Sequence, residues 1–292
     1  MHFSTANELL CLCSGEHITL SEAIIRREVD LFGAARADII ARMEHSLDIM
    51  EAAVKRALTE DLTSMGGLVG GEAKLLEQYE RERVTACGSL TSRAMRYALG
   101  VMEVNASMGL IVAAPTAGSS GVIPGVVLGL GDHYDLPREA RLGALFCAGA
   151  VGYIIMRNAT VSGAEGGCQA ECGAAAAMAA AAAVMLAGGD AGQVGHAVSI
   201  ALMNCMGLVC DPVAGLVQIP CSYRNASQAV NAFLSADMAL AGQDAVIPPD
   251  EAVEAMFRVG RQLPAELRET ALGGVAVTPT ALEIQRRLLE ET

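Results

Sequence analysis

Three segments of the sequence interrupt its helical pattern with glycine, proline and cysteine: residues 162–172, 207–213 and 218–225. Each places a cysteine beside turn-forming residues, namely Cys168, Cys210 and Cys221. Thiolates at such positions can converge on one point, because the backbone there can approach a metal cluster closely and donate N–H groups to its sulfurs. The alternative is that each cysteine is a small, buried apolar side chain.

Spacing alone does not decide between these two interpretations. The sequence has no CxxC pair, and Cys210 lies 42 positions after Cys168. Metal binding and ordinary burial therefore both remain open from the residues themselves. We interpret the other cysteines outside these segments as buried packing residues: Cys11, Cys13, Cys87, Cys147 and Cys205.

Polar residues that could bind a substrate or move a proton lie near these segments. Residues 105–109 and 115–121 are irregular and rich in Gly and Ser, and such segments can present hydroxyl, amide and backbone donors to a carboxylate. Their other interpretation is that they cap helices and turn the chain. The candidates for substrate contact are Asn105, Thr116, Gly118, Ser119 and Ser120.

Two glutamates flank Cys168 and are candidates for proton transfer. Glu165 and Glu171 could each accept a proton with a pKa raised by the surroundings, or could simply support a ligand loop. His196 lies among Ala, Val and Ile in a helical stretch, which indicates a hydrogen-bonded core histidine.

The elements that must position these residues are predicted to be helices. Residues 36–58 carry apolar side chains at helical spacing, and residues 19–22 have the form of a capping box. Three further positions have residue types typical of helix starts: Asp190 with Gln193, Pro249 alone, and Thr278 with Pro279. Since no strand alternation persists, we expect a mainly α fold, a compact multi-helix domain. A segment with four glycines, residues 64–71, is predicted to be a hinge or a site loop.

Composition limits the kinds of partner. The net charge of −13 argues against nucleic acid, whose binding relies on a cationic surface. Aromatic residues make up only 3% of the chain and Trp is absent, so helices rich in Ala and Gly are expected to pack closely around a small polar site. A small substrate is therefore the better candidate.

The chain is expected to be cytoplasmic and not to enter a membrane. The N-terminus lacks the cationic and apolar segments of a secretory signal, and nine cysteines in a cytoplasmic chain do not indicate a disulfide framework. Residues 104–131 and 172–189 carry no charge. The first is interrupted by prolines and glycines and the second is mostly alanine, so neither is predicted to span a bilayer.

Several longer strings resemble the alpha subunit of iron–sulfur L-serine dehydratases. They are PTAGSSGVIPG, SGAEGGCQAECG, GLVCDPVAGLVQIPC and SYRNA, with MEHSLDIMEAAV and GLVGGEAKLL in the N-terminal half. The resemblance runs from about residue 20 to the C-terminus, with the strings in the family's order. The helical pattern before residue 60 and the composition shift at residue 64 indicate an N-terminal helical segment, residues 1–63, and a catalytic cluster-binding helical domain, residues 64–292, within one continuous domain. The resemblance implies that its Gly-rich loops converge on an iron–sulfur site.

The resemblance also implies a cofactor and its ligands. In that family a 4Fe-4S cluster is held by the cysteines of GGCQAE, of CDPVAG and of the Ile-Pro-Cys that follows, which here are Cys168, Cys210 and Cys221. Cys172 lies where family members differ, and we interpret it as a packing residue facing the same side as Cys168. Three thiolate ligands leave one iron free to polarise the hydroxyl of L-serine, so that elimination gives pyruvate and ammonia.

Pyridoxal phosphate is the usual alternative cofactor for this reaction and requires a lysine. The chain has only Lys55, on the charged face of a predicted helix, and Lys74, without a phosphate-binding neighbour. We therefore expect no pyridoxal phosphate.

The family pattern implies a partner. Some members carry a second module with a Ser-rich motif, a His and a Thr, and no such string occurs here. The chain thus resembles a separate alpha subunit that needs a beta subunit, forming a hetero-oligomer. No cysteine follows Cys221, which argues against a ligand from a C-terminal tail. Two alternatives remain, a cysteine desulfidase using the same open iron and a non-catalytic iron–sulfur sensor or assembly subunit.

Overall fold

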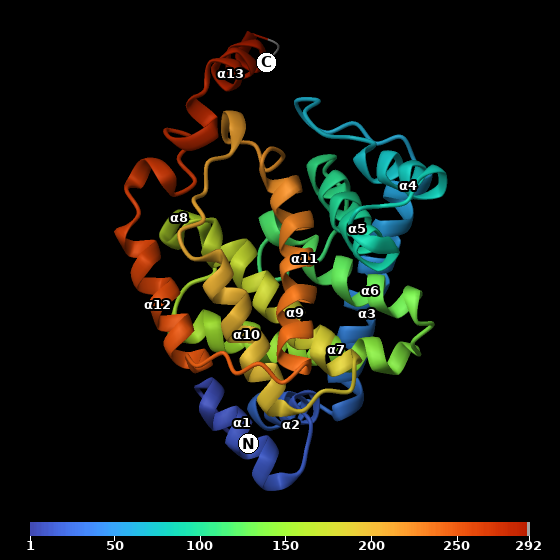
Figure 1. The fold of residues 1–292 in the computed structure, drawn as a ribbon, viewed down its shortest axis with the longest axis vertical. Helices are drawn as coiled ribbons and strands as arrows, with labels where there is room; N and C mark the ends of the chain where they lie inside the picture. Colours follow the sequence, from blue (N-terminus) through green and yellow to red (C-terminus); the bar gives the residue numbers. More distant parts are fainter. Residues whose placement is uncertain (291–292) are drawn as a thin grey trace.

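The computed structural model describes residues 1–290, and every long element in that range is an α-helix (Figure 1). The predicted mainly α fold is confirmed. Between residues 1 and 290 the only β pairing is an isolated bridge between Cys210 and Arg268. The α-helices are α1 (Ala6–Glu16), α2 (Leu20–Phe32), α3 (Arg36–Thr59), α4 (Glu72–Glu82), α5 (Gly88–Ala106), α6 (Val122–His133), α7 (Arg138–Asn158), α8 (Gly163–Gly166), α9 (Ala174–Leu186), α10 (Ala191–Cys205), α11 (Cys221–Leu240), α12 (Pro249–Gln262) and α13 (Pro279–Glu290).

Five short helical turns connect these helices, and two of them contribute to the site described below. Four are 3₁₀ turns and one, η2, is a π-helix that runs directly into α9. They are η1 (Ala117–Ser119), η2 (Gln169–Gly173), η3 (Val213–Gly215), η4 (Ala265–Leu267) and η5 (Gly274–Val277).

The helix starts follow the local signals of the sequence. The Thr19 side chain accepts a hydrogen bond from the Glu22 backbone N–H and caps α2. Asp190 and Gln193 form a reciprocal capping box at α10. Pro249 occupies the first turn of α12. These expected helix starts are confirmed.

Helix α9 lies in the middle of the molecule and packs against α6, α7, α10 and α11 (Figure 1). Its sequence, AAAAMAAAAAVML, has nine alanines, and its residues from Ala174 to Val184 are all buried. Small side chains allow the surrounding helices to approach closely, and the interior is therefore dense without many aromatic rings. The abundance of alanine thus has the structural role that the composition indicated.

The glycine-rich segment of residues 64–71 is a loop between α3 and α4 that is fixed at two points. The buried Glu103 carboxylate on α5 accepts hydrogen bonds from the Gly71 N–H at 3.0 Å and the Ala73 N–H at 2.7 Å, at the start of α4. The side chain of Gln218, three positions before Cys221 in the sequence, is hydrogen-bonded to the loop backbone. The loop is therefore connected to the segment that carries one predicted ligand.

The N-terminal helices pack on the rest of the chain. Helix α1 contacts α10 and α12, α2 contacts α7, and α3 contacts α5. The division at residue 63 stays a prediction, and residues 291–292 lie outside the described part of the chain.

Two helical segments are long and apolar enough to cross a membrane by length and composition, Arg138–Asn158 and Gln169–Leu186. The second overlaps residues 172–189, which the sequence analysis does not expect to span a bilayer. However, 56% of the apolar window in Arg138–Asn158 and 83% of that in Gln169–Leu186 is buried inside the protein. Their apolar character is therefore explained by their place in the core.

Three further expectations about single residues need correction. The His196 Nδ1 accepts a hydrogen bond from the Ala245 N–H at 3.3 Å, but the side chain is 41% exposed, so it is not a core histidine. Cys11 and Cys87 are exposed, whereas Cys13, Cys147 and Cys205 are buried as expected. Cys11 lies in the middle of α1 on a surface that no other described helix covers, and Cys87 is the N-cap of α5, so apolar character alone did not predict their exposure.

Candidate active site

Cys168 lies between α8 and η2, where a glycine turn sets its position. Gly167 has φ +73°, and a Cβ at this position would lie 2.6 Å from Leu263 Cδ1 and 3.0 Å from the Leu208 carbonyl oxygen. Only glycine combines this backbone angle with so little space. The next residue after Cys168, Gln169, donates its N–H to the same Leu208 carbonyl at 3.0 Å, which joins this segment to the one that carries Cys210.

Cys210 and Cys221 reach the same region from two other segments. The Cys210 N–H donates to the Leu267 carbonyl at 2.9 Å, and its own carbonyl accepts from the Glu269 N–H at 2.8 Å. Cys221 is the first residue of α11. The sequence therefore folds so that all three predicted ligands lie at turns or helix ends, as the pattern of glycine and proline indicated.

We call Cys168, Cys172, Cys210 and Cys221 the thiol group. Cys168, Cys172 and Cys210 are buried and pack against one another. Cys221 is half-buried and close enough to interact electrostatically with the other three. The Cys172 side chain packs against Cys168 and thus faces the same side, as the i+4 spacing predicted. A set of converging thiols is the donor chemistry that iron–sulfur clusters require.

The thiols differ in their tendency to ionise. The interaction with Cys172 lowers the pKa of Cys168, and Arg224 acts in the same direction, whereas burial opposes both. Burial raises the pKa of Cys221 to about 12 and also raises the pKa of Cys210. The pKa of Cys172 is raised first by its interaction with Cys168 and then by burial. A bound metal would displace these protons, because thiolates are the ligands.

Glu171 lies in the π-helix η2, beside the thiol group. Its Oε1 accepts a hydrogen bond from Thr116 Oγ1 at 2.8 Å, and its Oε2 lies 3.9 Å from Cys210 Sγ. Burial is the main cause that raises the pKa of this carboxyl, and the nearby Glu269 raises it further. A Cβ on Gly163 would lie 2.6 Å from Glu171 Oε2, so the carboxylate fits closely against α8. π-helical turns are frequent at functional sites, although no pattern in the sequence predicted this one.

The other candidate for proton transfer, Glu165, lies outside this arrangement. It is exposed, and its Oε2 accepts a hydrogen bond from Thr160 Oγ1 at 2.5 Å. Of the two glutamates, only Glu171 therefore contacts the thiol group in the structure.

The candidates for substrate contact divide into two sets. Thr116 contacts Glu171, and the Gly118 carbonyl accepts a hydrogen bond from Asn225 Nδ2 at 2.7 Å, next to the thiol group. The half-buried Asn105 donates to the Ala117 carbonyl at 3.3 Å. Ser119 and Ser120 are fully buried and bond within their own turn. Thr116 and Gly118 thus lie at the site, Asn105 borders it, and the serine hydroxyls point into the fold.

Asn225 and Arg224 are site residues that the sequence analysis did not single out, although the string SYRNA contains both. The fully buried Asn225 amide donates to the Cys221 carbonyl at 2.9 Å and accepts from the Gly121 N–H at 2.9 Å. Its Nδ2 also lies 3.8 Å from Cys172 Sγ. One amide therefore joins the 116–121 turn, the start of α11 and the thiol group.

We predict that Asn225→Ala lowers the free energy of unfolding by roughly 2–4 kcal/mol, because it leaves buried backbone groups such as the Gly121 N–H without a partner. Urea denaturation of the full chain measures this. Asn204→Ala is the control, since that side chain is exposed and should change the free energy by less than about 0.5 kcal/mol. Equal effects of the two substitutions would contradict the bridging role of Asn225.

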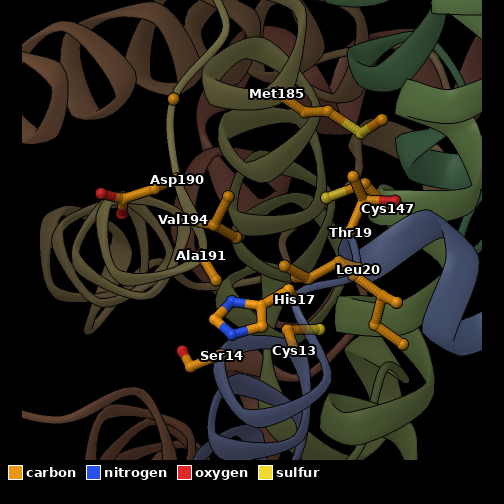
Figure 2. Close-up of a pocket in the computed structure, with 12 residues that line it drawn as sticks. Cys13, Ser14, His17, Thr19, Leu20, Cys147, Met185, Asp190, Ala191 and Val194 are labelled. Atoms are coloured by element: carbon orange, nitrogen blue, oxygen red, sulfur yellow. The ribbon is translucent and has the colours of Figure 1, made fainter.

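A cavity of about 340 Å³ lies elsewhere, between α1, α2, α7, α9 and α10, and is shown in Figure 2. Two buried thiols line it, Cys13 and Cys147, whose pKa values burial raises to about 11 and about 12. None of its lining residues belongs to the thiol group or contacts Glu171. The chemistry described above is therefore confined to the region around η2.

Comparison with known proteins gives a family for this arrangement. The family described as serine dehydratase alpha chain matches residues 15–276. The chain belongs to this family. A probable L-serine dehydratase alpha chain of Bacillus subtilis (strain 168) is 46% identical over 98% of this chain and 95% of its own length. The L-serine dehydratase alpha chain of Peptoniphilus asaccharolyticus is 42% identical over 99% of both chains. The family predicted from the sequence strings is thus confirmed.

Other relatives of this serine dehydratase alpha chain are longer. L-serine dehydratase TdcG of Escherichia coli (strain K12) is 36% identical over 94% of this chain, but the match covers only 62% of that protein. The longer relatives therefore contain a further region beside the one that corresponds to this alpha chain.

Proposed function

We propose that this chain is the catalytic alpha chain of an L-serine dehydratase that converts L-serine to pyruvate and ammonia with a 4Fe-4S cluster. The observation that carries the proposal is the convergence of the thiol group with the Glu171 carboxyl, in a chain whose relatives are named L-serine dehydratases. The proposed ligands are Cys168, Cys210 and Cys221.

The side chains of the thiol group are suitable ligands for a 4Fe-4S cluster. Soft thiol donors come from three segments, and no lysine lies among the neighbours described for the thiol group. When bound, the cluster supplies an iron with an open position that acts as a Lewis acid toward a hydroxyl. Lys74 is paired with the exposed Asp61, so its amine is engaged in an ion pair.

Glu171 is the proposed proton acceptor. Its partly buried carboxyl is held by the Thr116 hydroxyl through Oε1, which leaves Oε2 on the side of Cys210. A carboxylate fixed in this way can take the α proton of L-serine while the β hydroxyl departs as hydroxide, and the proton taken up by Glu171 then converts that hydroxide to water. The resulting aminoacrylate rearranges and hydrolyses to pyruvate and ammonia.

The irregular 105–121 segment is proposed to bind the substrate. Thr116 and Gly118 lie beside Glu171, so this turn can orient the serine carboxylate relative to the proton acceptor. Asn105 and the buried Ser119 and Ser120 would support the turn, since each bonds to a residue within it.

We further propose a cytoplasmic enzyme with a separate beta subunit. The names of the Bacillus subtilis and Peptoniphilus asaccharolyticus relatives contain the words alpha chain, and the match to the longer TdcG covers only 62% of that protein. A beta subunit corresponding to the remaining part of TdcG would complete the site.

The test is anaerobic purification of the full chain, with iron and sulfide analysis and assays of pyruvate release from L-serine. We expect about four irons per chain and turnover that depends on adding a beta chain. L-cysteine is assayed in parallel, because a desulfidase would release sulfide from it.

Two results would contradict the proposed function. The first is that the protein, with full iron content and with its beta chain added, forms no pyruvate from L-serine. The second is that it turns over L-cysteine in preference to L-serine. The first would favour a sensor or assembly subunit, and the second would favour a desulfidase.

A further inference from the structure

Arg224 connects the segments that carry the three proposed ligands. It lies three positions after Cys221 on α11, so the two side chains occupy neighbouring positions on one helix surface. Its Nη1 donates to the Val209 carbonyl oxygen at 2.6 Å, and its Nη2 pairs with Asp211 Oδ1 at 2.7 Å. Val209 and Asp211 are the two neighbours of Cys210.

The same guanidinium also lies near the third segment, close enough to Cys168 for the two side chains to interact electrostatically. One side chain thus contacts the chain on both sides of Cys210, lies near Cys168 and is anchored beside Cys221. These contacts come from parts of the sequence that are otherwise separate loops and helix ends.

The partners of Arg224 are themselves fixed. The Asp211 side chain is only 3% exposed, and its Oδ2 accepts a hydrogen bond from the Val275 N–H at 2.7 Å. The Arg224 side chain is 17% exposed. A charge pair with so little solvent contact costs desolvation energy and is weak evidence for stability alone. Its geometry is therefore better explained by what it positions.

Arginine is the residue suited to this task. Its planar, forked group can donate in several fixed directions at once, whereas a lysine ammonium is a compact charge on a flexible stem. A lysine at this position would keep the positive charge but could not reproduce the same set of directed contacts.

We propose that Arg224 is a positioning residue that holds the thiols of Cys168, Cys210 and Cys221 at a common site before the cluster is inserted. The proposal rests on the ligand set given under the proposed function. It assigns to Arg224 no contact with substrate and no part in proton transfer.

The test uses arsenite and the full chain without iron. Arsenite condenses with three thiols to a neutral product, releasing three waters, so its affinity reports how well three thiols are placed rather than how well a negative charge is compensated. Binding is measured by equilibrium dialysis on wild type, Arg224→Met, Arg224→Lys and the control Arg258→Met. Arg258 is 70% exposed and pairs only with Glu254 on the same helix, among the contacts of the described residues.

We expect Arg224→Met to weaken arsenite binding by at least roughly tenfold, as for loss of charge-assisted hydrogen bonds. Arg224→Lys should be weakened to a similar extent, and Arg258→Met should bind as wild type does. Unfolding is followed for each variant. If Arg224→Met does not fold, Arg224→Lys and Asp211→Asn provide the same comparison, since Asp211→Asn releases one arm of the guanidinium.

Wild-type arsenite affinity in Arg224→Met would overturn the proposal, as would full recovery in Arg224→Lys, because charge alone would then be sufficient. A variant that loses stability but keeps its affinity would also overturn it. Iron content is measured on the same preparations. A different result would separate the two proposals. If arsenite binding depended on Arg224 but the wild-type protein never retained iron, the proposed function would be contradicted and the positioning role of Arg224 would still be supported.

Discussion

Alanine in place of Cys168, Cys210 or Cys221 is expected to abolish iron retention and to lower L-serine turnover about a thousandfold or more. Each substitution removes one of three thiols that would hold the cluster, and with it the Lewis acid that polarises the departing hydroxyl. A thousandfold loss corresponds to about 4 kcal/mol in activation free energy, within the range supplied by a metal ion. Iron analysis and visible absorption of anaerobically prepared protein measure retention, and pyruvate release measures turnover.

Two matched variants make this experiment specific. Cys147→Ala removes a fully buried thiol on α7 that bonds weakly to the Ala181 carbonyl, so it should keep its iron. Cys172→Ala should also keep most of its iron, because Cys172 is not a proposed ligand. Cys172 is more deeply buried than Cys221 and packs against Cys168, so the reverse result is informative. Loss of iron in Cys172→Ala with retention in Cys221→Ala would replace Cys221 by Cys172 in the ligand set.

Glu171→Gln is expected to lower kcat about 10²–10⁴-fold while iron content stays near that of wild type. This is the range attributed to a positioned general acid or base. Glutamine has nearly the same shape and can still accept the hydrogen bond from Thr116, so the turn should remain in place. The KM for L-serine should change much less than kcat, because the lost interaction belongs to proton removal rather than to binding.

Glu165→Gln is the matched control. It lies six residues before Glu171 but is exposed and bonded to Thr160, so its turnover should remain within a fewfold of wild type. Serine carrying deuterium at the α carbon adds a second measurement, since slower proton removal in Glu171→Gln should increase the isotope effect on kcat. If Glu165→Gln were the slower enzyme, Glu165 would become the better candidate for the proton acceptor.

Local features of the fold could be predicted because they depend on near neighbours in the sequence. Thr19, Asp190 and Pro249 start helices through contacts within one turn, and their residue types alone indicate this. The exposure of His196 and Cys11 could not be predicted in the same way, because it depends on which distant helices cover each position.

The site could be predicted only in part, for a similar reason. The strings around Cys168, Cys210 and Cys221 named the proposed ligands, but the choice of Glu171 over Glu165 required the π-helix, which turns one carboxyl toward Cys210. The parts played by Arg224 and Asn225 depend on contacts with residues as far away in the sequence as Gly118. No local pattern in the string SYRNA shows where those side chains point.

The alanine helix α9 has a consequence for how the protein tolerates change. All its residues from Ala174 to Val184 are buried against four neighbouring helices, so a larger side chain at almost any of these positions would clash with a neighbouring helix. Since η2 runs without a break into α9, a shift of that helix would be transmitted to Glu171 and Cys172. Saturation mutagenesis should therefore find that the alanines of α9 tolerate substitution nearly as poorly as the cysteines do. Because Glu171 and Cys172 would be displaced first, we expect activity to fall before the chain unfolds.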